Sequence, residues 1–156
     1  MKLQPFFDPQ NTWYLQQPGA TAEDINRLEQ LFGLSLPADY RELISWSNGG
    51  DFIVGKMYFR LWSIEDVEQR NSALDVQRYV RGSLVIGNDA GDFLYLLDYV
   101  LGTDEPAFVE LEAGSLDRAY AVVHGINLTA ALRSWSGIDA ARARLLGCLA
   151  IRTSKA

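Results

Sequence analysis

LSLPADYRELISWSNGG, residues 34–50, is the stretch of this sequence that says most about how the chain folds. Pro37 suits the first position of a helix, where its missing N–H costs nothing and its fixed φ is already helical. Four residues follow the i, i+3, i+4, i+7 spacing of one helical face: Tyr40, Leu43, Ile44 and Ser47. The glycines after Asn48 reach positive φ at little cost and end the helix. The stretch predicts a short helix with one buried face, followed by a turn.

The preceding segment, residues 21–33, has the same organisation. Thr21 is a suitable N-cap with Asp24 three residues later, and Gly33 is a suitable residue to end the helix. The apolar stripe between them consists of Ile25, Leu28, Leu31 and Phe32. The sequence therefore predicts two consecutive helices near the N-terminus, preceded by an irregular segment over residues 1–20.

The sequence patterns predict strands in the middle of the chain and helices at its end. Runs rich in aromatic and β-branched residues predict strands over 52–55, 56–61, 84–87, 93–98 and 107–111, with 119–123 as a further candidate. Ser63 is expected to cap a third helix, with Ile64, Val67 and Leu74 facing inward, and turn formers at 88–92 predict a chain reversal. Helices are expected over 128–135 and from 138 to about 152. This order predicts an α+β fold: N-terminal helices, a central, mainly antiparallel curved sheet and C-terminal helices.

Length and composition indicate one globular domain. The 156 residues are 48% hydrophobic and 12% aromatic, which is enough for a packed core. The N-terminal residues lack the apolar core of a signal peptide, and no window is apolar enough to span a membrane. Cys148 is the only cysteine, so an internal disulfide is excluded. We expect a cytoplasmic protein.

Charge is distributed unevenly along the chain. The net charge is −6, yet residues 82–117 contain eight acidic residues and no lysine or arginine, whereas residues 118–156 contain six basic residues and one acid. Phosphate binding needs a concentrated basic face, so a direct nucleic-acid role is disfavoured. An acidic surface instead suits a basic protein partner.

Residues able to carry chemistry are few. His124, the only histidine, follows an apolar run and is expected to be a structural or surface residue. Cys148 lies on or beside the apolar stripe of the last helix. These two residues are too few for a usual zinc site. Asp89 and Asp92 flank a glycine turn that does not match the calcium-loop pattern, and turn aspartates usually bind nearby backbone N–H groups. We expect no catalytic residue, metal or cofactor. A small-molecule-binding module or a hydrolase built on a carboxylate pair stays open as a third possibility.

Surface recognition is the function that the residues favour. Phe93, Tyr95, Tyr99 and Phe108 are interleaved with the acids, as in interfaces where aromatic anchors sit within a polar rim, and about half of them should face the core. The run 93–98 is apolar on both faces, which predicts a central strand with the interface at its ends. The candidate partner-binding residues are Asp89, Asp92, Asp98, Tyr99, Asp104, Glu105, Glu110 and Glu112.

Three blocks of the sequence resemble the SUKH superfamily, which contains yeast cell-wall-assembly regulators of the Smi–Knr type and many bacterial immunity proteins. The first is Ile25-x-x-Leu28-Glu29-x-x-Phe32-Gly33-x-x-Leu36-Pro37-x-x-Tyr40-Arg41-x-x-Ile44-x-x-Ser47-Asn48-Gly49-Gly50. The others are LWSIEDV at 61–67 and IGNDAGDFLYLLDY at 86–99, where Ala90 replaces a glycine common in the family. The blocks lie between about residues 20 and 112 of a single domain spanning 1–156, with 126–156 as a helical C-terminal extension.

This resemblance carries expectations about function and partners. It implies the α+β fold and a non-enzymatic immunity protein that binds and neutralises a cognate secreted toxin, basic in character and for example a nuclease. The alternative is a regulatory protein–protein interaction scaffold of the Smi–Knr type. No fixed contact residues follow, since immunity proteins vary their interfaces to match their toxins. We expect a monomer or weak dimer.

Overall fold

The computed structural model describes residues 3–7 and 14–137. Its elements, in chain order, are η1 (Gln4–Phe7), β1 (Tyr14–Gln16), α1 (Ala22–Phe32), α2 (Ala38–Trp46), β2 (Gly50–Val54), β3 (Met57–Leu61), α3 (Ile64–Ala73), α4 (Val76–Tyr79), β4 (Ser83–Asn88), β5 (Phe93–Asp98), β6 (Ala107–Glu112), η2 (Arg118–Tyr120), β7 (Val122–Gly125) and α5 (Leu128–Ser136). None of the helices within these residues is long and apolar enough to cross a membrane.

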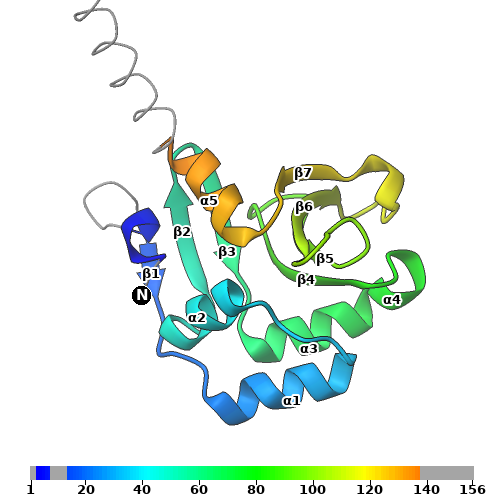
Figure 1. The fold of residues 1–156 in the computed structure, drawn as a ribbon, viewed down its shortest axis with the longest axis horizontal. Coiled ribbons are helices and arrows are strands. Elements are labelled where there is room, and N and C mark those ends of the chain that lie inside the picture. Colours follow the sequence, from blue (N-terminus) through cyan, green and yellow to red (C-terminus); the bar gives the residue numbers. More distant parts are fainter. Residues whose placement is uncertain (1–2, 8–13, 138–156) are drawn as a thin grey trace, which may run out of the picture.

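The seven strands form one sheet whose spatial order follows the sequence, β1 to β7, and each neighbouring pair is antiparallel. Strands β3 and β4 meet at only two residue pairs, Arg60 with Asn88 and Leu61 with Gly87. Figure 1 shows that the sheet changes direction at this junction, so that β2 and β3 run at a steep angle to β4 and β5. The predicted α+β single domain with a curved antiparallel sheet is confirmed.

Helices cover both faces of the sheet (Figure 1). Helix α5 lies inside the bend, where it contacts β2, β6 and β7, while α3 and α4 pack against β4 and α1 packs against α3. Strand β5 is buried from Leu94 to Asp98, which confirms that it is central and covered on both faces. Of the four aromatic residues interleaved with the acids, Tyr95 and Phe108 lie in the core, whereas Phe93 is exposed and Tyr99 is half-buried.

Local capping explains where the helices begin and end. The Thr21 hydroxyl accepts a hydrogen bond from the Asp24 N–H at 3.2 Å, and the Ser63 hydroxyl accepts one from the Asp66 N–H at 3.2 Å. Gly33 ends α1 in the left-handed conformation with φ 63°, as predicted. Pro37 lies one position outside α2, as its N-cap, because its ψ of 153° is extended although its φ of −67° would fit a helix.

Several predicted elements differ from the observed ones. Residues 1–20 were expected to be irregular, yet η1 and β1 form, because Phe7 packs against Trp46 and Phe52 and β1 pairs with β2. The strand expected at 119–123 is instead η2 followed by β7, and the four-residue helix α4 was not predicted. The helix over 128–135 is confirmed as α5. The helix expected from 138 to 152, with Cys148, lies outside the described residues.

Candidate functional site

The predicted partner-binding residues divide between the two ends of the β5–β6 hairpin. At one end Phe93 pairs with Glu112, and at the other Asp98 pairs with Ala107, so the ends are separated by five residue steps, or about 17 Å. We call Asp89, Asp92, Glu110 and Glu112 the turn-end group, and Tyr99, Asp104 and Glu105 the loop-end group. The eight residues therefore do not form one continuous surface.

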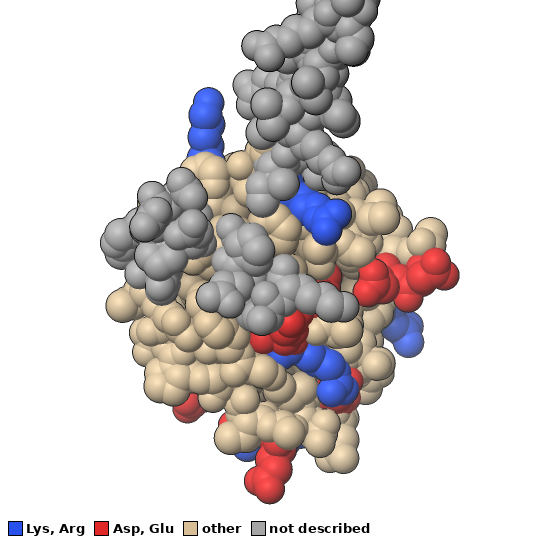
Figure 2. Space-filling view, turned by 60° about the vertical axis from the view of Figure 1, so that its left-hand side comes forward, with Lys and Arg blue, Asp and Glu red and all other residues tan. Residues whose placement is uncertain are grey.

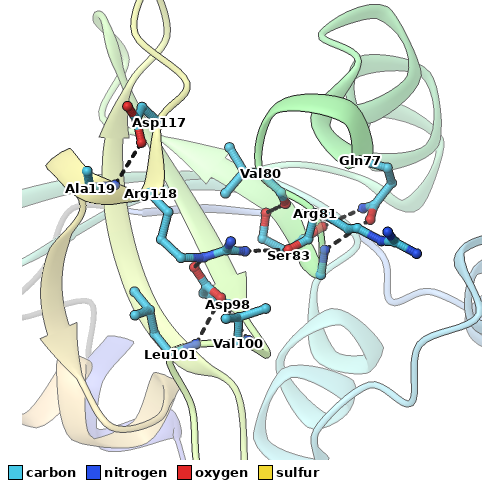
Figure 3. Close-up of polar contacts among 11 residues, drawn as sticks. Gln77, Val80, Arg81, Ser83, Asp98, Val100, Leu101, Asp117, Arg118 and Ala119 are labelled. Atoms are coloured by element: carbon cyan, nitrogen blue, oxygen red, sulfur yellow. Dashed lines mark hydrogen bonds and ion pairs between the residues drawn. The ribbon is translucent and has the colours of Figure 1, made fainter.

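Asp98 belongs to neither group because its side chain is fully buried. One carboxylate oxygen, Oδ2, accepts a hydrogen bond from Arg118 Nε at 2.8 Å, and the other, Oδ1, accepts from the backbone N–H groups of Val100 at 2.9 Å and Leu101 at 3.1 Å (Figure 3). Arg118 also donates to the Arg81 carbonyl. The expectation that Asp98 faces a partner was wrong: its carboxylate is satisfied inside the fold and holds the turn after β5.

The same close-up shows that the neighbouring polar groups are structural too (Figure 3). Gln77 Nε2 donates to the Ser83 carbonyl at 2.6 Å and Gln77 Oε1 accepts from the Gly82 N–H at 3.2 Å. The Ser83 hydroxyl, itself buried, donates to the Val80 carbonyl at 2.7 Å. These bonds fix the connection between α4 and β4 beside the buried Asp98–Arg118 pair.

The loop-end group is largely committed to holding its own loop. The Tyr99 hydroxyl donates to the Ser35 carbonyl at 2.6 Å, which ties the β5–β6 loop to the link between α1 and α2. Burial, with the negative charges of Glu29 and Asp39, raises the pKa of Tyr99 to about 12 against the opposing effect of Arg41. Glu105 accepts a hydrogen bond from the side chain of Asn127, which caps α5. Asp104 is exposed and makes no such bond to a described residue.

The turn-end group contains two uncommitted acids. Asp89 Oδ1 accepts hydrogen bonds from the N–H groups of Gly91 at 2.8 Å and Phe93 at 3.2 Å, so this side chain shapes the β4–β5 turn in the way usual for a turn aspartate. Asp92 and Glu112 are exposed, and neither lies within ion-pair distance of a described lysine or arginine. They are neighbours, because Glu112 pairs with Phe93 and the Ala113 N–H donates to the Asp92 carbonyl at 2.7 Å.

A hollow of about 210 Å³ opens beside these acids. We call it the acidic hollow; its lining residues are Phe93, Glu110, Glu112, Ser115, Tyr120 and Val122. Phe93 pairs with Glu112 and Glu110 pairs with Val122, so these four side chains share the sheet face on which α5 packs. Small-molecule pockets usually measure about 300–1,000 Å³ and are mostly apolar, so the acidic hollow suits a single side chain of a protein partner better than a metabolite.

An aromatic cluster lies on the same sheet face, between the acidic hollow and α5. His124 packs among Tyr95, Phe108 and Trp135; its Nδ1 accepts a hydrogen bond from Trp135 Nε1 at 3.1 Å, and its Nε2 lies 3.5 Å from Glu110 Oε1. This position fits the expected structural role of the histidine. Burial, with the charges of Glu110 and Asp89, raises the pKa of Tyr95, whose hydroxyl thus lies in the negative field of the turn-end group.

The acidic residues within 82–117 differ from those elsewhere in the described chain in how they are neutralised. Six acids outside residues 82–117 form ion pairs with arginine: Asp24, Glu29, Asp51, Asp66, Glu68 and Asp75. Within 82–117, among the described residues, only Asp98 pairs with an arginine. Figure 2 shows a different face, toward the β1 edge, where red and blue side chains are few and most of the described surface is tan. The described residues contain no group of three or more His, Cys, Asp or Glu that could hold a metal ion.

Sequence reasoning missed Tyr120 and Val122, which complete the acidic hollow. Val122 lines the hollow because β7 pairs with β6 so that Val122 lies opposite Glu110, and Tyr120 lies in η2, just before this strand. A local alternation pattern does not indicate which residues of two strands pair. The acids on the other wall were found because charge is readable directly from the sequence.

Comparison with known protein families identifies the family of this chain. A protein-family model described as the SMI1/KNR4 family (SUKH-1) matches residues 19–122, two thirds of the chain. The matched region begins just before α1 and ends at the first residue of β7. No curated protein matches the chain.

Proposed function

Since this chain belongs to the SMI1/KNR4 family (SUKH-1), we propose that it is a non-enzymatic immunity protein that acts in the cytoplasm and neutralises a cognate secreted toxin. In this proposal the toxin domain is basic and binds to exposed acidic residues of the segment 82–117. The family membership supports a role in binding a protein, and the charge distribution indicates which kind of protein.

The observation that carries the proposal is the set of unneutralised acids. Asp92, Asp104, Glu105, Glu112 and Asp117 are exposed, and none lies within ion-pair distance of a described lysine or arginine. Uncompensated charges of one sign produce a field that steers an oppositely charged partner and disfavours wrong partners. The field here is negative, so the favoured partner is basic.

A nuclease toxin fits this requirement. Enzymes that act on nucleic acid bind phosphates with clustered lysine and arginine side chains. An acidic inhibitor that covers such a surface presents carboxylates where the phosphates would lie, so it excludes the substrate without any chemistry of its own.

The experiment is calorimetric titration of the full chain with the purified C-terminal domain of a secreted protein encoded beside it. We expect tight 1:1 binding at about 0.05 M salt and clearly weaker binding at about 0.5 M, because salt screens exposed charges over a few ångströms. A folded toxin domain that does not bind would overturn that pairing. Equal affinity at both salt concentrations would remove the acidic surface from recognition.

A regulatory scaffold of the Smi–Knr type is the second candidate, because the matching family is described by its SMI1 and KNR4 members. A scaffold binds several cellular proteins, whereas an immunity protein binds one toxin tightly. Affinity capture from cells with and without the toxin separates the two: several partners that do not depend on the toxin would favour the scaffold.

A further inference from the structure

Strand β7 forms one edge of the sheet and is unusually apolar for an edge. It is last in the strand order, and no described strand pairs with its outer side. Proteins usually protect such edges with lysine, proline or a covering element, because unpaired backbone groups are a template for another strand. The sequence of β7, VVHG, contains neither lysine nor proline.

The side chains along this edge are exposed on both faces. The exposed fractions are 71% for Tyr120, 52% for Val122, 54% for Val123 and 77% for Ile126. Four of the ten large apolar side chains that stand exposed in the described residues therefore fall within seven consecutive positions. Exposed apolar side chains that cluster in this way mark interaction sites more often than scattered ones do.

The charges beside β7 indicate which kind of partner would bind at this strand. Val122 lies opposite Glu110 and lines the acidic hollow together with Glu112, whereas Arg118, the nearest basic residue along the chain, is turned toward the buried Asp98. A second copy of this chain would bring its own Glu110 and Glu112 to the same edge, where like charges repel. A basic segment is attracted instead.

We propose that β7 accepts an extended, basic segment of the partner as an eighth strand. Main-chain hydrogen bonds to the outer edge of β7 would supply affinity, as in other cases of strand addition, and alternate side chains would supply specificity. Basic side chains on the α5 face enter the acidic hollow between Phe93 and Tyr120, where Glu110 and Glu112 meet their charge and the aromatic faces meet their stems. Apolar side chains on the other face pack beside Val123.

This inference deepens the proposed function and rests on the chain having a basic protein partner. It differs from that function in naming the strand and the hollow that receive the partner. It is tested with a synthetic peptide in place of the toxin, so that the two proposals are able to fail separately.

The probe is an eight-residue peptide of alternating arginine and valine with blocked ends, titrated into the full chain while backbone amides are followed by NMR and hydrogen exchange. We expect saturable binding with slowed exchange at residues 121–126. Two further peptides carry methyl groups on backbone nitrogens, one at all valines and the other at all arginines. In one of these two peptides the methyl groups replace the N–H donors that face β7. That peptide should bind at least ~10-fold more weakly than the unmethylated peptide. Replacing arginine by glutamate should abolish binding.

Two substitutions locate the site. Glu112→Lys should weaken binding of the arginine–valine peptide at least ~10-fold. Glu23 is an exposed acid on α1, and Glu23→Lys should change the affinity for the peptide less than about twofold. Binding that neither N-methylated peptide weakens, or protection outside residues 121–126, would overturn the inference. So would a dimer of the chain through β7 that the peptide does not displace. If the toxin domain binds but leaves β7 unprotected, strand addition fails and the immunity function stands.

Discussion

Glu29 shows how one charged side chain fixes the junction between the first two helices. One carboxylate oxygen accepts a hydrogen bond from the Leu36 N–H at 2.8 Å, and the other accepts one from Arg41, which also donates to the Leu36 carbonyl. Burial raises the pKa of Glu29, but the hydrogen bonds from Arg41 and Leu36 and the charge of Arg41 outweigh it, so the pKa is lowered from its ordinary value of 4.5.

A lowered pKa in the folded state gives a defined pH dependence. The carboxylate of Glu29 stabilises the fold above pH 4.5, and this contribution is lost as the pH falls through the lower, folded-state pKa. Glu29→Gln should therefore lower the free energy of unfolding by about 1 kcal/mol at pH 7. The difference in free energy of unfolding between the wild type and Glu29→Gln should shrink as the pH falls through the folded-state pKa of Glu29. Urea denaturation at neutral and acidic pH measures this difference, and a difference independent of pH would contradict this role.

Asn71 acts at the scale of elements by joining α3 to β4. Its side chain is buried; Nδ2 donates to the carbonyls of Val67 at 2.7 Å and Val85 at 2.8 Å, and Oδ1 accepts from the Val85 N–H at 2.9 Å. The pairing of β4 with β5 shifts register between Val85 and Gly87. The asparagine thus supplies both partners of the Val85 backbone where the strand ladder is irregular.

Asn71→Leu keeps a similar volume but leaves both Val85 groups without partners. The expected loss is about 3 kcal/mol in the free energy of unfolding, because each buried unpaired backbone group costs about 1–3 kcal/mol. Ser72→Ala, at the exposed neighbouring position, is the matched control and should change stability by less than about 0.5 kcal/mol. Equal midpoints of urea denaturation for the two variants would show that this amide does not join the elements.

A helix or strand could be predicted from the sequence where the residues that determine it are close together in the chain. The beginnings of α1 and α3 were predicted because Thr21 and Ser63 cap them within three residues. Strands β1 and β7 have three and four residues, and they exist because β2 and β6 offer paired backbone, which no local pattern reports. Helix α4 begins at Val76, and its N-cap, Asp75, has a left-handed conformation with φ 53°, which is uncommon for a residue other than glycine.

At the scale of the whole molecule, the sequence predicted the charge of the proposed recognition surface but not the arrangement of its residues. The excess of acids in residues 82–117 can be counted, whereas the burial of Asp98 depends on Arg118 reaching it from 20 residues further along the chain. The division between the turn-end and loop-end groups depends on the β5–β6 register. The apolar edge of β7 beside the acidic hollow emerges only when β5, β6 and β7 are assembled.

The association rate with the proposed basic toxin domain at low salt tests most directly whether the turn-end acids attract such a partner. Two double variants raise the net charge equally: Asp92→Lys with Glu112→Lys beside the acidic hollow, and Glu23→Lys with Glu65→Lys at the exposed starts of α1 and α3. We predict that the first pair slows association at least ~10-fold and the second less than about threefold. Equal slowing by both pairs, or none by the first, would contradict recognition at the turn-end group.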